Sequence, residues 1–231
     1  MKLRTLNVSF LLLQGLLTLI DCIAVAYLSP ILVSLGYSNL RIGWIMTLGA
    51  LASALARPVW GTLNDRFSCA RQVTLGSTAV GMGCYFFLTH SAAHPAVTAF
   101  AVMGLYVTVV CMMNFADAWA LRLISSGAAL NYGATRAGGS FSYAVGAAAF
   151  GSLAARWGFM PGNYILWGLF ILLCGVVCTL PNPPPAGQQR ARKAPFLYES
   201  LAALSKNRVY CVMLAAFFLC TLATCSMESF Y

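Results

Sequence analysis

Residues 8–28 read VSFLLLQGLLTLIDCIAVAYL, a run of 21 residues that is almost wholly apolar. A helix needs about 20 such residues to cross the hydrocarbon core of a bilayer, so this run is long enough to span a membrane. The rest of the chain has a similar composition, because 60% of its 231 residues are hydrophobic and only 8% are charged. Soluble domains carry about 25% charged residues. The composition therefore excludes a soluble enzyme and predicts an integral membrane protein.

Further apolar runs, bounded by glycine, proline or charged residues, continue along the chain. The six predicted spans are Val8–Leu28, Ile42–Trp60, Val73–Thr89, Val97–Leu121, Arg136–Ala155 and Tyr164–Leu180. A seventh run begins at Val209 and reaches Tyr231. Backbone amides in lipid must be hydrogen-bonded within each segment, so every span is expected to be helical. We expect an all-α membrane protein with a six-helix domain in residues 1–180 and an incomplete seventh span in residues 208–231.

Residues 181–207 differ in composition from the runs on either side. This segment opens Pro-Asn-Pro-Pro-Pro and carries three basic residues between positions 190 and 193. Such a composition is typical of a linker between two bodies. Apolar residues recur at helical spacing within 196–204, which predicts a short amphipathic helix on the membrane surface. We expect a basic cytoplasmic linker here.

The basic residues predict the orientation of the chain. With the N-terminus in the cytoplasm, 12 of the 14 lysines and arginines lie on the inner side, and only Arg41 and Arg156 lie outside. Cytoplasmic loops of membrane proteins carry this excess. We expect a multi-pass protein of the cell membrane, without the basic and aromatic patch that binds nucleic acid. A cleavable signal peptide is the alternative for the first run, although Asp21 interrupts its apolar stretch.

The connection between the second and third runs combines a glycine, an acidic residue and basic residues. Gly61 is expected to allow a neighbouring helix to approach closely. Asp65, Arg66 and Arg71 can form a charge network that holds two helices together in one state and releases them in another. We treat these four residues as a candidate inner gate. An ordinary positively charged inner loop is the alternative.

Two charged residues fall inside the fourth and fifth runs. Asp117 lies several residues from the inner end of its run, and Arg136 enters the next run from that same end. A lone charge at the bilayer centre costs roughly 2.5–3.5 kcal/mol, so we expect an ion pair between them. Arg122 is a rival partner for Asp117, and Asn114 shares a helical face with Asp117. The pair is either purely structural or also contacts a transported solute.

Asp21 lies near the middle of the first run, with Gln14 and Thr18 on the same helical face. Removal from water disfavours the charged form of a carboxyl, which makes Asp21 a candidate proton carrier. A permanently hydrogen-bonded aspartate is the alternative, and Glu228 in the seventh run is a similar candidate. The candidate residues for substrate binding or proton coupling are therefore Asp21, Gln14, Asn114, Asp117 and Arg136.

The fifth run also carries small residues at helical spacing, at Gly138, Ser142, Gly146 and Ala149. Small side chains let two membrane helices approach closely. We expect this stripe to pack against a neighbouring helix.

Two of these stretches resemble a known family. The G-x-L-x-D-R pattern of residues 61–66, followed by Arg71, looks like the signature loop of the major facilitator superfamily. Residues 132–140, YGATRAGGS, are similar to the Y-G-x-x-R-x-x-G-S element of its branch related to lactose permease, nucleoside:proton symporters and phenylpropionate-type permeases. The resemblance covers the chain from about residue 6 to the end.

This resemblance implies a twelve-helix transporter made of two six-helix domains, with the substrate bound between them. It also implies that acidic and basic residues of the fourth and fifth spans meet the substrate. On this basis the chain supplies the first domain, the linker and most of span seven, and its partner is a missing C-terminal half.

These observations favour a secondary active transporter that moves a small organic solute by alternating access, and we expect the transport to be coupled to protons. No cofactor or metal is expected, because the nine cysteines lie mostly in apolar runs without metal-ligand spacing. An intramembrane enzyme is disfavoured, because both histidines lie in one outer turn. The alternative is a complete six-span binding or scaffold protein that acts as a homodimer. The sequence leaves sugars, nucleosides, aromatic acids and drugs open as solutes.

Overall fold

The computed structural model describes residues 3–67, 70–90, 94–182 and 207–230. Within these ranges the chain forms helices and short connections and contains no strand, so the predicted all-α class is confirmed for them. The chain divides into two compact units, residues 1–185 and residues 186–231. The first unit contains the candidate site.

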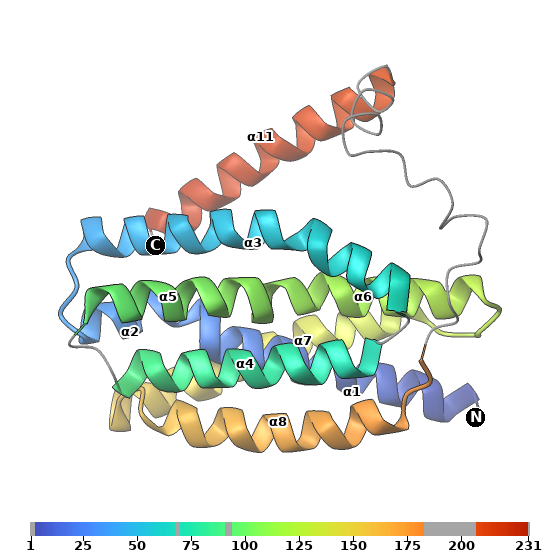
Figure 1. The fold of residues 1–231 in the computed structure, drawn as a ribbon, viewed down its shortest axis with the longest axis horizontal. Helices are drawn as coiled ribbons and strands as arrows, with labels where there is room; N and C mark the ends of the chain where they lie inside the picture. The colour runs from blue at the N-terminus through green and yellow to red at the C-terminus, as the bar shows by residue number, and fades with distance from the viewer. Residues whose placement is uncertain (1–2, 68–69, 91–93, 183–206, 231) are drawn as a thin grey trace. The chain divides into compact units, whose positions relative to one another are not determined.

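The helices of the first unit follow one another with short connections (Figure 1). They are α1 (Leu3–Asp21), the π-helical segment η1 (Cys22–Ala26), α2 (Leu28–Ser34), α3 (Asn39–Phe67), α4 (Ala70–His90), α5 (Pro95–Leu105), the π-helical segment η2 (Tyr106–Val110), α6 (Cys111–Ser125), α7 (Tyr132–Trp157) and α8 (Pro161–Thr179). The second unit contains α11 (Arg208–Phe230). Because η1 joins α1 to α2 and η2 joins α5 to α6, the described residues form seven helical segments, six of them in the first unit.

Four helical segments among the described residues are long and apolar enough to cross a membrane. They are Leu6–Ser34, Asn39–Gly61, Pro95–Ser125 and Pro161–Thr179, and they correspond to the predicted first, second, fourth and sixth spans. The first of them continues past the predicted end at Leu28 to Ser34. α4 and α7 occupy the predicted third and fifth spans, and the count of six spans stays a prediction. The predicted amphipathic helix of the linker lies outside the described residues.

α1 and α7 pack together along the small residues of α7. A Cβ atom added at Gly138 would lie 2.9 Å from Cγ of Leu11 on α1. In the same interface, a Cβ atom added at Gly15 would lie 2.8 Å from Oγ of Ser142. The predicted packing role of the small stripe is therefore confirmed at these positions, whereas Ala149 is exposed.

The π-helical segment η2 interrupts the fourth helical segment near its middle. Two neighbouring helices donate side-chain hydrogen bonds to its backbone carbonyls. Trp60 Nε1 of α3 donates to Val107 O at 2.9 Å, and Ser77 Oγ of α4 donates to Thr108 O at 3.3 Å. π-helical turns are rare and frequently lie at functional sites. These bonds fix η2 between α3 and α4.

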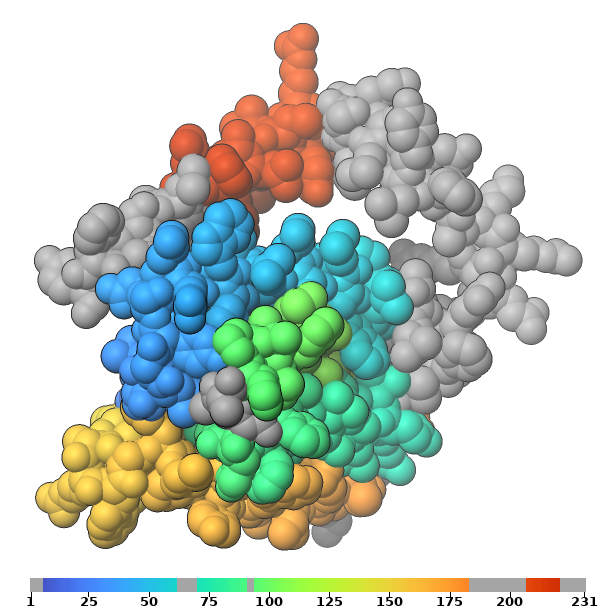
Figure 2. Space-filling model, turned by 60° about the vertical axis from the view of Figure 1, so that its left-hand side comes forward, coloured from blue at the N-terminus to red at the C-terminus, as the bar shows by residue number. Residues whose placement is uncertain are grey.

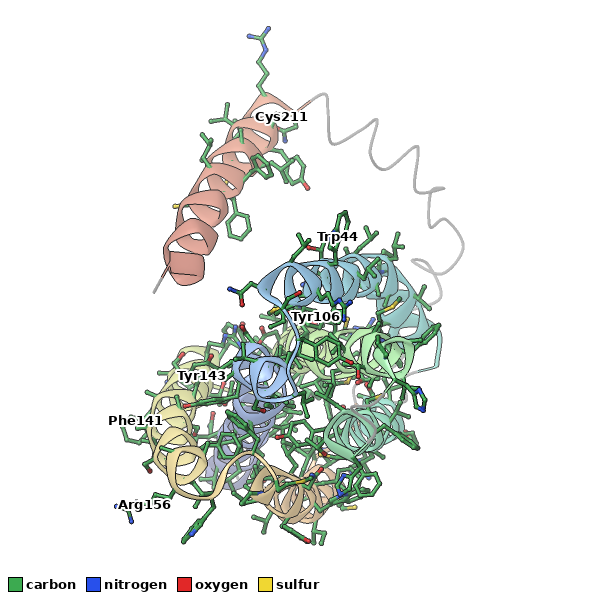
Figure 3. The ribbon with its side chains drawn as sticks, turned by 90° about the vertical axis from the view of Figure 1, so that its left-hand side faces the viewer. Trp44, Tyr106, Phe141, Tyr143, Arg156 and Cys211 are labelled. Carbon is green, nitrogen blue, oxygen red and sulfur yellow. The ribbon has the colours of Figure 1, made fainter. Side chains whose placement is uncertain are left out.

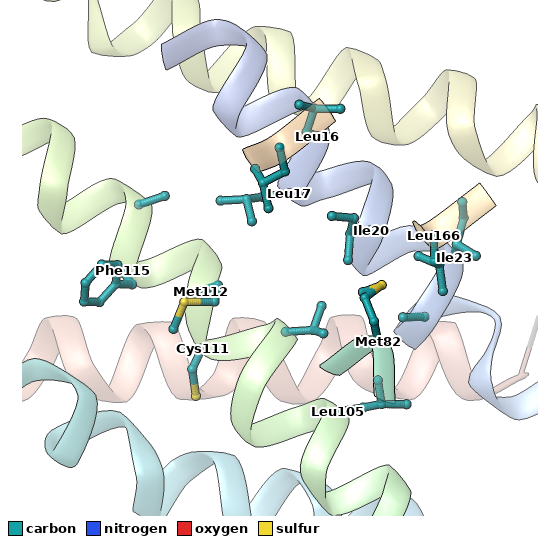
Figure 4. Close-up of a cluster of buried hydrophobic side chains, with 14 of the residues drawn as sticks. Leu16, Leu17, Ile20, Ile23, Met82, Leu105, Cys111, Met112, Phe115 and Leu166 are labelled. Carbon is teal, nitrogen blue, oxygen red and sulfur yellow. The ribbon is translucent and has the colours of Figure 1, made fainter. Parts of the chain in front are cut away.

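An apolar core fills the middle of the first unit (Figure 4). It contains buried side chains from many of the helices, among them Leu17 of α1, Met82 of α4, Met112 of α6 and Leu166 of α8. Figure 2 shows one end of this unit, where α5 in green lies between α3 in blue and α4 in blue-green. Helices in lipid associate through close packing and hydrogen bonds rather than through the hydrophobic effect.

Large apolar side chains on α3 point out of the first unit. Trp44, Leu48, Leu51, Leu55 and Val59 are all exposed, and their spacing of three or four residues places them on one helical face. Figure 3 shows Trp44 on this outer face. A continuous exposed apolar stripe of this kind suits contact with lipid.

Candidate functional site

An acidic side chain of α6 and a basic side chain of α7 meet inside the first unit. Nη1 of Arg136 lies 3.5 Å from Oδ2 of Asp117. The expected ion pair between Asp117 and Arg136 is therefore present. The start of α7 is fixed by Asn131, whose side chain accepts a hydrogen bond from the backbone N of Ala134 at 3.1 Å. This cap places Arg136 in the second turn of α7.

Gln14 of α1 joins the ion pair. Its Nε2 atom donates a hydrogen bond to Oδ1 of Asp117 at 2.8 Å. The Gln14 side chain is fully buried, with 0% exposure, and its Oε1 atom has no hydrogen-bond partner among the described residues. A buried polar atom without a partner costs about 1–3 kcal/mol. Three helices thus meet in a cluster of Gln14, Asp117 and Arg136, called here the polar centre.

The polar centre has unused hydrogen-bonding capacity. Both oxygens of Asp117 are engaged, one by Gln14 and the other by Arg136. A guanidinium has five N–H donors, and the Arg136 side chain is 46% exposed, so several donors remain accessible. The unpaired Oε1 of Gln14 adds an acceptor. The arrangement can bind a polar solute that both accepts and donates hydrogen bonds.

The spacing of Asn114 and Asp117 predicts that both side chains face the same site, but Asn114 faces a different one. It lines a cavity of about 320 Å³ between α3 and α6. This α3–α6 cavity is lined by Arg57, Trp60, Gly61, Cys111, Asn114, Phe115 and Ala118. Positions three apart on a helix are rotated by about 60°, which is enough for Asn114 to face the cavity while Asp117 faces Gln14 and Arg136.

Arg57 is the cavity residue that sequence reasoning missed. The sequence pattern assigns Arg57 to the inner side together with most of the other lysines and arginines, and an excess of positive charge is common on that side. The available signal was its position inside the apolar run Asn39–Gly61 rather than beyond its end. An ionisable residue within a span is by default a candidate for function.

Asp21 ends α1 and precedes η1, away from the ion pair. It is seven residues from Gln14, which is about 10 Å along a helix axis. It lies near Tyr106 of η2, which is among the helices of the first unit in Figure 3. Among the described residues, no basic side chain forms an ion pair with Asp21. Thr18, on the same face, donates to the backbone O of Gly139 at 3.0 Å and so belongs to helix packing.

The expected gate differs from the prediction in two respects. Residues 61–67 do not form a loop, because α3 continues as a helix to Phe67. Among the described residues, a Cβ atom added at Gly61 would meet no other atom within 4 Å, so the expected close helix approach is not seen there and stays a prediction. Gly61 instead lines the α3–α6 cavity, where its missing side chain leaves room.

The remaining gate residues are only partly described. Nε of Arg71, in the first turn of α4, donates a hydrogen bond to the backbone O of Leu180 at the end of α8. Arg71 thereby ties the ends of two helices together. Asp65 and Arg66 lie on α3, and their side chains, like that of Glu228 on α11, are outside the described part of the structure. A gating role for these residues stays a prediction.

Four helices of membrane-spanning length and a charged pair held among apolar helices define a multi-pass helical membrane protein. The family model described as Major Facilitator Superfamily matches residues 11–231, and the chain therefore belongs to that superfamily. Its members are membrane transporters that carry small solutes, rather than enzymes. A comparison with curated proteins gave no match, and neither did a comparison with solved structures.

Proposed function

We propose that this protein is a secondary active transporter that moves a small organic solute by alternating access, with the polar centre as part of its solute site. Gln14, Asp117 and Arg136 contact the solute in this proposal. The observation that carries it is the ion pair between Asp117 and Arg136, joined by the buried Gln14 amide.

A purely structural ion pair explains the polar centre less well. An ion pair that only links helices is most stable when every hydrogen-bonding atom around it is satisfied. Here the Gln14 Oε1 atom is buried and unpaired, and the Arg136 side chain is nearly half exposed. A solute that accepts from Arg136 and donates to Gln14 would complete both sets of hydrogen bonds.

The proposal also covers the orientation of the chain, its branch of the superfamily, its proton coupling and its gate, and these parts rest mainly on the sequence. The N-terminus is proposed to be cytoplasmic, the protein to belong to the branch related to lactose permease, nucleoside:proton symporters and phenylpropionate permeases, and the helical body described here to work together with a second six-helix body. Solute moves with protons, and Asp21 is the proposed proton carrier. Support for this role comes from its place within a candidate membrane span and next to η1. The candidate inner gate at Gly61, Asp65, Arg66 and Arg71 then regulates access from the cytoplasm.

The test is solute uptake by cells that produce the full-length protein. Labelled sugars, nucleosides, aromatic acids and drugs are supplied, and the transported solute is identified by saturable uptake above control cells. Arg136→Gln and Asp117→Asn are each expected to lower this uptake at least roughly tenfold, because a charge-assisted hydrogen bond is worth about 1.5–3 kcal/mol. Arg156→Gln, at the exposed outer end of the same helix, is the matched control and is expected to keep normal uptake.

The double variant Asp117→Asn with Arg136→Gln separates a structural role from solute binding. It leaves no unpaired charge in the bundle, so it is expected to fold and reach the membrane. If it transports as well as the parent protein, the polar centre serves only the fold. Absence of saturable uptake of every solute would favour the dimeric scaffold and overturn the proposal.

A further inference from the structure

Arg57 is a charged side chain that the polar centre does not use. It lies four residues before Gly61, where a candidate membrane span ends, which is about 6 Å along the helix axis. No acidic side chain forms an ion pair with it in the part of the chain that the structure describes. Its neighbour is the Cys111 thiol, which is a weak and uncharged partner. The guanidinium therefore lacks a counter-charge within this part of the chain.

The α3–α6 cavity lies directly beside Arg57. Its volume of about 320 Å³ is within the range of small-molecule sites, about 300–1,000 Å³. Asn114 supplies an amide that makes no hydrogen bond within the described ranges, and Trp60 and Phe115 supply aromatic walls. Among the residues that the structure describes, the lining contains no acidic side chain. One cation, one amide and two aromatic rings thus surround the same space.

The backbone and one hydrogen bond shape this cavity. Pro58 lies inside α3 and cannot donate a helical hydrogen bond, which bends a helix. Figure 1 shows the last part of α3, in cyan, turning toward α6. The Trp60 ring is held by its hydrogen bond to Val107 O, and Phe115 is 5% exposed. The aromatic walls are therefore positioned before any ligand arrives.

We propose that the α3–α6 cavity binds a small organic acid. Its carboxylate lies against Arg57 and Asn114, and its flat apolar body lies against Trp60 and Phe115. A guanidinium fork matches a carboxylate with two parallel hydrogen bonds, and an amide NH2 group adds a donor. Aromatic rings bury an apolar body with a preferred geometry. This inference rests on the proposed transport function. The cavity and the polar centre are then two parts of one solute site, the acid is the transported solute, and an organic anion is the substrate class.

The experiment measures ligand binding without transport. Thermal unfolding of the full-length protein in detergent is followed with increasing concentrations of benzoate, of benzamide and of inorganic phosphate. Benzoate is expected to raise Tm in a saturable manner, because it has both the charge and the ring. Benzamide has the ring without the charge, and phosphate has the charge without the ring, so neither is expected to raise it comparably.

Two variants test the cavity, each with a matched control on the same helix. Arg57→Gln removes the cation, and Gly61→Leu fills the cavity while leaving Arg57 in place. Their controls are Arg41→Gln and Gly43→Leu. A Cβ atom at Gly61 or Gly43 would meet no atom of the described residues within 4 Å, so both leucines are expected to be tolerated. We expect the first two variants to weaken benzoate binding at least roughly tenfold and the controls to retain it within about twofold.

Three results overturn this inference: no saturable response to benzoate, an equal response to benzamide or phosphate, or unchanged binding by Arg57→Gln and Gly61→Leu. In those cases the role of the Arg57 side chain is only to extend its charged end to the membrane surface. Uptake that depends on Asp117 would then still support the proposed transporter. The opposite result is also informative. If benzoate binding needs Arg57 and Gly61 but the protein moves no solute, the binding site is supported and the proposed transport function is refuted.

Discussion

Gly81 of α4 lies where that helix contacts η2, and replacing it by alanine tests this packing. A Cβ atom at Gly81 would lie 2.7 Å from Cγ2 of Val109 and 3.0 Å from Oγ1 of Thr108. Both neighbours are β-branched and buried, so neither can rotate away at low cost. The matched control is Gly83→Ala on the same helix, because a Cβ atom at Gly83 would meet nothing within 4 Å in the described part of the chain.

The two substitutions add the same methyl group and should have opposite effects on stability. In both, alanine reduces the backbone entropy lost on folding and stabilises a helix by about 0.5–1 kcal/mol. At Gly81 this gain is opposed by overpacking, which costs typically 1–3 kcal/mol. We therefore expect Gly81→Ala to be about 1–3 kcal/mol less stable than Gly83→Ala.

Thermal unfolding of the purified protein in detergent measures this difference. One kcal/mol shifts Tm by about 2–4 °C in a domain of about 150–250 residues, so the two midpoints should differ by at least about 2 °C. Equal midpoints would refute the reasoning, because the contact between α4 and η2 would then have space for a methyl group.

Two further predictions concern α1 and α3. Asp21→Asn removes the proposed proton carrier, so solute uptake should lose its dependence on pH and on uncouplers; uptake with unchanged uncoupler sensitivity would eliminate Asp21 from this role. Trp60→Phe keeps an aromatic ring but loses the 2.9 Å hydrogen bond to Val107 O, and should lower stability by about 0.6–1.7 kcal/mol. Unfolding at the parent temperature would contradict the second prediction.

The elements of the fold that could be predicted depend on short stretches of sequence. An apolar run such as Pro161–Thr179 is recognisable because its length and composition alone make it a candidate span. The small residues at Gly138 and Ser142 were also informative, since their helical spacing places them on one face. The end of α3 was missed, because residues 61–67 are polar enough to suggest a loop while the helix continues to Phe67.

The candidate site was predictable only in part. The pairing of Asp117 with Arg136 follows from similar depth and opposite charge, which the order of the runs provides. The contact of Gln14 with Asp117 joins residues 103 positions apart, and sequence spacing contains no information about such a distance. The grouping of Asn114 with Arg57 was missed for the same reason.

The sequence by itself determined that this protein is helical, lies in a membrane and carries charge at a few positions within its apolar runs. These properties are local, because the transfer of each segment from water to lipid depends mainly on its own residues. The tertiary structure alone decided which helical faces meet, and so divided the polar residues between the polar centre and the α3–α6 cavity. Asn114 and Asp117 differ by a rotation of about 60° around α6. Packing against α3 places Asn114 in the cavity, and packing against Gln14 and Arg136 places Asp117 in the polar centre.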